Sequence, residues 1–187
     1  MEALSAYAEL SGNSLRRAEL TTDDEGCLVS AQSKSGVTVL YPNGVPGVAE
    51  SQFLSERLDA PVFWFHIHDG DFWMYTLFER GVVVDQFNPM PDYWERVDDA
   101  ERSAWAGNAQ EVAKRITGLA PEAISNYLVP WDESRVRDGS GKAYAMDRSC
   151  YGTDWQLVDF MDKIGFTYPV DDHGTVIGGT YQLSPRR

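Results

Sequence analysis

The sequence predicts an α+β protein built on a mostly antiparallel sheet, with helices packed on one face of it. Strand-like segments gather in the first half of the chain and helix-like segments in the second half, without regular β-α-β alternation. The stretch 61–88 holds three apolar runs separated by Asp69-Gly70 and Arg80-Gly81, a pattern typical of tight antiparallel hairpins. A chain of 187 residues that is 43% hydrophobic is also long enough for a substantial core.

The first half of the chain is expected to contribute about five strands and two helices. Less polar side chains recur at helical spacing over 2–10 and 48–58, so we expect a helix in each of these segments. Strands are expected over 27–32 and 37–41, and the acidic stretch 23–26 before them is typical of a turn. The other three strands lie within 61–88 and form a three-stranded antiparallel meander.

The turn at Asp69-Gly70 decides which side chains of the meander share a face. If it is a two-residue turn, His66 lies opposite Trp73, and His68 lies opposite Asp71. Side chains of a strand alternate between the two faces of a sheet. One face would then carry four aromatic side chains, Trp64, His66, Trp73 and Tyr75. The other face would form the core through Phe63, Phe65, Ile67, Phe72 and Met74.

The second half of the chain is predicted to be mainly helical, because the composition changes after Pro91 from β-branched and aromatic residues to helix formers. Asp98 or Asp99 can cap a helix that ends at Trp105. Further segments with helical spacing or helix-start signals cover 109–116, 121–128 and 154–164. An edge strand is expected over 175–183. We predict a single domain over 1–187, with a helical subdomain over 92–165 as a finer division.

Charge and composition exclude several classes of partner. Twenty-nine acidic residues against sixteen basic ones give a net charge of −13, which would repel nucleic acid and anionic membranes. The sequence has neither a signal-like start nor an apolar run of the roughly 18 residues needed to span a bilayer, so we expect a cytoplasmic protein. Cys27 and Cys150 lack metal-binding spacing. We therefore predict no cofactor.

The preferred functional hypothesis is a non-enzymatic protein-binding module, such as an inhibitor or an immunity-type antitoxin, that blocks a basic partner protein. Six tryptophans and nine tyrosines are many for a chain of this size, and aromatic anchors surrounded by charge are typical of protein interfaces. Acidic patches would steer a cationic partner into contact. The candidate partner-binding residues are aromatic or acidic: Trp94, Trp105, Trp131, Asp98, Asp99 and Glu101.

Two alternatives from other functional classes remain open. A metal-dependent enzyme would use His66, His68 and Asp71, because residues two apart on a strand project to the same side and a carboxylate at the turn could complete the ligand set. The same residues could instead make ordinary cross-strand contacts, with His68 paired to Asp71 and His66 stacked on Trp73. A small-molecule binding protein would use a pocket formed by Trp64, His66, Trp73 and Tyr75.

Overall fold

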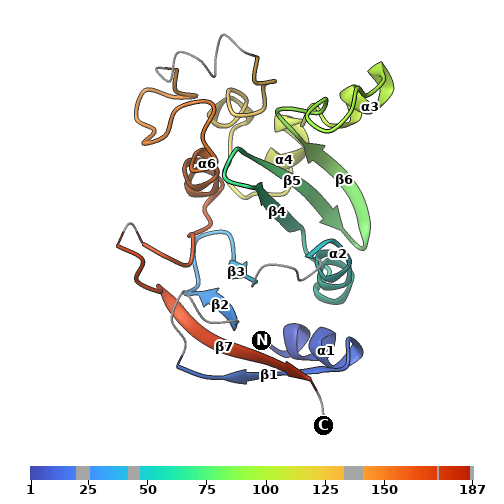
Figure 1. The fold of residues 1–187 in the computed structure, drawn as a ribbon, viewed down its shortest axis with the longest axis vertical. Coiled ribbons are helices and arrows are strands. Elements are labelled where there is room, and N and C mark those ends of the chain that lie inside the picture. Colours follow the sequence, from blue (N-terminus) through green and yellow to red (C-terminus); the bar gives the residue numbers. More distant parts are fainter. Residues whose placement is uncertain (20–25, 42–46, 133–140, 172, 186–187) are drawn as a thin grey trace.

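The computed structural model describes residues 1–19, 26–41, 47–132, 141–171 and 173–185 (Figure 1). Within these ranges the chain is an α+β protein with two antiparallel sheets, of four and three strands. The predicted fold class is confirmed, whereas the prediction of one sheet of about five strands is wrong. The turn predicted before Cys27 lies almost entirely outside the described residues. None of the described helices is both long and apolar enough to cross a membrane.

The four-stranded sheet joins the two ends of the chain, and its strand order is β1-β7-β2-β3. Its strands are β1 (Asn13–Arg17), β2 (Gly26–Ser30), β3 (Val39–Leu40) and β7 (Gly178–Pro185). Helix α1 (Glu2–Leu10) has the bounds predicted for it and leads directly into β1. Strand β7 pairs with β1 on one side and with β2 on the other, so it is a central strand and not the predicted edge strand.

The three-stranded sheet consists of β4 (Val62–His68), β5 (Phe72–Glu79) and β6 (Val82–Phe87), in the predicted meander order. Its second turn has the predicted form, because Glu79 pairs with Val82 across Arg80-Gly81, both of which have positive φ. Its first turn is one residue longer than predicted. His68 pairs with Phe72, so three residues separate the strands.

This longer first turn corrects the predicted faces of the sheet, since a shift of one residue moves every side chain of a strand to the opposite face. Phe65 pairs with Tyr75, and Trp64 pairs with Thr76. Trp73 and Tyr75 therefore share a face with Phe63 and Phe65, away from Trp64 and His66. The predicted four-residue pocket is split between two faces. The predicted core face is split as well, because Phe72 and Met74 lie on the side of Trp64.

Helices cover both faces of the three-stranded sheet, which corrects the prediction that they pack on one face. Helix α2 (Gly47–Leu58) begins against the indole of Trp64, while the ring of Phe160 in α6 (Gln156–Ile164) lies 6.2 Å from the ring of Phe65. Neighbouring residues of a strand point to opposite faces, so α2 and α6 lie on opposite sides of β4.

The second half of the chain is less helical than predicted. Its other described helices are short: α3 (Asp99–Ala104), α4 (Ala109–Ala113) and the 3₁₀ helix η1 (Pro121–Ala123). Their starts follow the predicted signals, because the side chains of Asp98 and Asn108 cap α3 and α4. Helix α6 ends at Gly165, whose φ of 80° is the left-handed conformation that terminates many helices.

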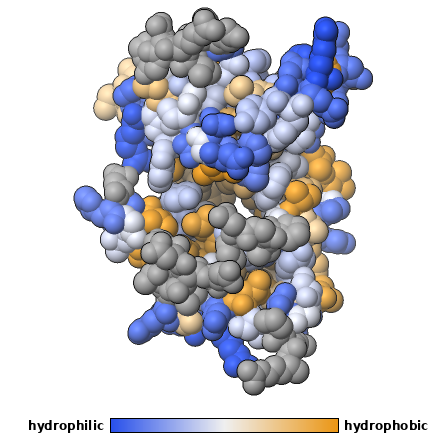
Figure 2. Space-filling view, viewed as in Figure 1, coloured by the Kyte–Doolittle hydropathy of each residue, from blue (hydrophilic) through white to orange (hydrophobic). Residues whose placement is uncertain are grey.

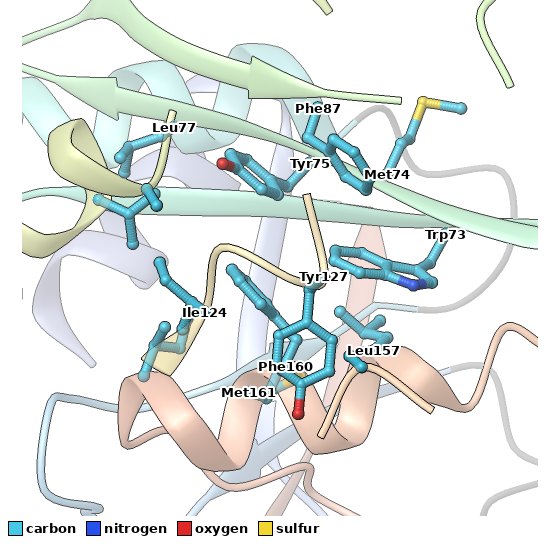
Figure 3. Packing of buried hydrophobic residues seen from close by; sticks show 14 of the residues in the cluster. Trp73, Met74, Tyr75, Leu77, Phe87, Ile124, Tyr127, Leu157, Phe160 and Met161 are labelled. Carbon is cyan, nitrogen blue, oxygen red and sulfur yellow. The ribbon is translucent and has the colours of Figure 1, made fainter. Parts of the chain in front are cut away.

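The main core lies between α6 and the inner face of the three-stranded sheet (Figure 3). The ring of Phe160 is stacked on Tyr75 at 5.7 Å and lies 5.1 Å from Trp73. The indole N–H of Trp73 donates to the side chain of Gln156 at 3.3 Å, so its one polar atom is satisfied inside the core. Tyr127 closes this core from the segment after η1.

Candidate functional site: an aromatic cluster with an acidic rim

Four aromatic side chains gather beside the turn between β4 and β5, and we call them the aromatic cluster: His68, Phe72, Tyr93 and Trp94. The ring of His68 lies 4.9 Å from that of Trp94 and 5.2 Å from that of Tyr93, both nearly perpendicular to it. Phe72 is completely buried beneath them, whereas Trp94 is 56% exposed and Tyr93 is 40% exposed. The cluster therefore has a buried base and an exposed upper surface.

Two features of the backbone place Tyr93 and Trp94 over the strand ends. The pairing of His68 with Phe72 puts both of these rings on the same face of the sheet. After β6 the chain turns sharply, with the N–H of Tyr93 donating to the carbonyl of Met90 at 3.0 Å. The Tyr93 hydroxyl then donates to the carboxylate of Asp71 at 2.7 Å. This hydrogen bond raises the pKa of Tyr93 and ties the segment after β6 to the turn.

An arginine links this segment to α3. The guanidinium of Arg102 forms a two-point contact with the carboxylate of Asp92, one bond of which is 2.9 Å, and holds the pKa of Asp92 below its usual range. The same carboxylate accepts the N–H of Val97 at 3.0 Å, which closes the loop that carries Trp94. Planar, two-point arginine pairs hold their partners in a defined orientation. The segment that carries the exposed rings is thus fixed to the β4–β5 turn through Tyr93 and to α3 through Asp92.

Exposed carboxylates occur in the turn beside the aromatic cluster and along the segment that leads from the cluster into α3. We call these exposed residues the acidic rim: Asp69, Asp71, Asp92, Glu95, Asp98, Asp99 and Glu101. Only Arg96 and Arg102 lie among them, and Arg102 is already paired with Asp92. The region of α3 is correspondingly hydrophilic, at the upper right of Figure 2. The surface next to Trp94 therefore carries a strong negative charge.

The residues predicted to bind a partner are placed differently from one another. Trp94 is exposed, as are Asp98, Asp99 and Glu101. Trp105 is half-buried and packs against the core. Trp131 is 6% exposed and belongs to the core, so it cannot serve as a surface anchor. His68 and Phe72 were not predicted to be part of this surface, because only the three-residue turn brings them under Tyr93 and Trp94.

The predicted metal ligands make other contacts. No group of three or more histidine, cysteine or acidic side chains suited to a metal ion occurs among the described residues. Asp71 accepts the Tyr93 hydroxyl, and Nε2 of His68 lies 3.7 Å from the carboxylate of Asp69. His66 stacks on Trp64 at 5.4 Å, and burial together with the nearby His68 lowers its pKa. The predicted contacts of His68 with Asp71 and of His66 with Trp73 are therefore replaced by others.

Comparison with known protein families, with curated proteins and with solved structures finds no match for this chain. A role for the aromatic cluster and the acidic rim therefore rests on their own chemistry.

Proposed function

We propose that this chain is a non-enzymatic protein-binding module that holds a basic partner protein through the aromatic cluster and the acidic rim. The observation that carries the proposal is the half-exposed indole of Trp94, which stands on a buried aromatic base, with exposed carboxylates in its own segment and in the adjoining turn. Tryptophan is among the residues most enriched at the energetic centres of protein interfaces. An inhibitor or an immunity-type antitoxin is the most concrete form of this function.

Three physical features support a basic protein as the partner. Surrounding charge of one sign accelerates the approach of an oppositely charged protein, and the whole chain carries a net charge of −13. A lysine or arginine of the partner can stack on the exposed indole while it pairs with a nearby carboxylate. The contacts of Tyr93 with Asp71 and of Arg102 with Asp92 hold the surface in place before binding, which reduces the entropy lost in forming a complex.

The first test is the replacement of Trp94. The tagged chain is used to capture partners from a lysate of its source cells at low and at high salt, and the dissociation constant of the purified partner is then measured. We expect Trp94→Ala to weaken binding about tenfold or more, because it removes the aromatic anchor. Trp155→Ala is the matched control, since Trp155 is 57% exposed and lies outside the cluster. Equal effects of the two substitutions, or failure to capture a basic protein, would overturn the proposal.

Charge reversal in the acidic rim tests the electrostatic part of the proposal. The double variant Asp99→Lys and Glu101→Lys should slow association with the basic partner by about tenfold at low salt, and the difference should shrink as salt is added. Asp98 is left intact, because its carboxylate caps α3 by accepting the N–H of Glu101 at 2.8 Å. Stopped-flow association rates provide the measurement. Unchanged rates at low salt would exclude these two carboxylates from the binding surface.

A further inference from the structure

A wide cleft of about 1810 Å³ lies between the two sheets. One wall comes from β2, β3 and β7, and the other comes from α2 and β4. Figure 2 shows a hollow near the middle of the molecule with apolar side chains in its walls. Most of the lining is aliphatic or aromatic, and polar or charged side chains, among them Arg17, Glu50 and His66, make up the rest. Concave, mainly apolar surfaces with a few polar groups are typical of small-molecule sites.

One carboxylate in the wall of this cleft is only half satisfied. Glu50, in the first turn of α2, is 2% exposed. Its Oε1 accepts the hydroxyl of Tyr41, but its Oε2 has no hydrogen-bond partner within the described part of the chain. A buried polar oxygen without a partner is energetically unfavourable, and in native proteins such oxygens are rare. Glu50 therefore lines the cleft with a buried acceptor that has no partner in the described part of the chain.

Among the described residues, no basic side chain contributes to the shifted pKa of Glu50, although Arg17 of β1 also lines the cleft. Its titratable neighbours are Cys27 on β2 and Tyr41 after β3, with Tyr7 of α1 acting on Tyr41. All three side chains are neutral or negative, and the ion pairs formed among the described residues do not include Glu50. Burial without a cationic partner raises the pKa of Glu50 to about 7. A positively charged ligand would supply the missing charge.

The indole of Trp64 lies at the start of the helix that carries this carboxylate. A Cβ atom placed on Gly47 would lie 2.3 Å from the indole nitrogen of Trp64, so Trp64 packs directly on the backbone where α2 begins. Glu50 follows Gly47 by three residues and lies on the same side of the helix, one turn away. Trp64 and His66, which stacks on it, both line the cleft. The indole and the carboxylate thus both line the cleft, near the first turn of α2.

We propose that this cleft binds a small organic ammonium ion with an apolar body, whose N–H group donates to Oε2 of Glu50 and whose body rests on Trp64. An ammonium group satisfies both the hydrogen bond and the charge that Glu50 lacks, and its attraction to the face of an indole adds to the binding. The cleft extends as far as His68 and Asp69, but the proposed contacts with Glu50 and Trp64 involve neither Tyr93 nor Trp94, so the test is independent of the proposed partner protein.

Binding of such an ion depends on the ionisation of Glu50. The ammonium group pairs with the carboxylate form, so affinity should increase as the pH rises through about 7 and should be lost below it. His66 lines the same cleft, and burial together with His68 lowers its pKa, so it adds no competing positive charge in this pH range.

The experiment uses 2-phenylethylamine as the probe and isothermal titration calorimetry on the full chain at pH 8. We expect saturable binding that weakens about tenfold or more in Glu50→Gln, which keeps the shape of the side chain but not its charge. Glu56→Gln is the matched control, because Glu56 is an exposed acid on the same helix. The neutral analogue 2-phenylethanol should bind about tenfold more weakly than the amine.

Three outcomes would overturn the proposal. The first is no binding of the amine by the unmodified chain at concentrations up to about 10 mM. The second is a loss smaller than tenfold in Glu50→Gln, or an equal loss in Glu56→Gln. The third is binding of 2-phenylethanol as tight as that of the amine. Glu50→Gln should fold like the unmodified chain. A loss of amine binding in this variant would therefore report the missing charge and not unfolding.

Discussion

Replacing Phe160 with alanine should lower the free energy of unfolding by about 3–5 kcal/mol. The side chain of Phe160 is completely buried on α6, at the centre of the core. Its ring lies within 6.2 Å, centroid to centroid, of four other aromatic rings, those of Phe65, Trp73, Tyr75 and Tyr127. These neighbours come from β4, β5 and the segment after η1. They cannot all move inward to fill the space, so the substitution leaves a cavity.

Chemical denaturation, followed by circular dichroism, measures this loss of stability. Met146→Ala is the control, because Met146 is 89% exposed and its replacement should change stability by less than about 0.5 kcal/mol. A loss for Phe160→Ala as small as that of the control would contradict the central packing of α6 on the inner face of the three-stranded sheet.

Replacing Glu50 with glutamine should stabilise the protein above pH 7 and remove part of its pH dependence. Burial raises the pKa of Glu50 from 4.5 to about 7 in the folded chain. Between these values the folded state holds a proton that the unfolded state has released, so stability falls as the pH rises from about 4.5 to about 7. Above pH 7 the full penalty of the buried charge is present, and it amounts to about 3 kcal/mol at 1.36 kcal/mol for each pKa unit.

The measurement is the free energy of unfolding at pH 5 and at pH 8, for the unmodified chain, Glu50→Gln and Glu56→Gln. Glu50→Gln should be the more stable protein at pH 8 by about 2–3 kcal/mol, and the difference should shrink towards pH 5. Glu56→Gln, which changes an exposed acid of the same helix, should behave like the unmodified chain. A Glu50→Gln variant that is less stable at pH 8 would show that the buried carboxylate is already paired with a positive charge.

Local signals along the chain predicted the elements that depend on neighbouring residues. Helices α1 and α2, the Arg80-Gly81 turn and the cap of α3 by Asp98 all follow from spacing, turn residues or capping side chains. Their interactions join residues close together in sequence, which is why a pattern can reveal them. The acidic segment that leads into α3 was identified in the same way. Its exposure follows from its charge, since unpaired carboxylates stay in water.

Strand register and the contacts between distant segments were not predictable from the same signals. All side chains of β5 from Phe72 to Phe78 are buried on one face or the other, so hydrophobic alternation could not reveal the extra residue in the turn before it. Strand β1 was missed because its sequence, NSLRR, has little apolar character. It forms by pairing with β7, more than 160 residues away in sequence. Trp131 looked like a surface residue because of its polar neighbours, whereas it is buried by packing against the core.

The sequence by itself determined the α+β class, the main helices, the meander and the strong negative charge, because each of these depends on composition or on residues near one another in the chain. Only the tertiary structure decided that Tyr93 and Trp94 stand on His68 and Phe72, and that Glu50 faces a cleft between two sheets. Both sites join segments that are distant in sequence, and their contacts are set by strand register and by packing across the sheets. Such contacts produce no periodic pattern of residue types in a single sequence.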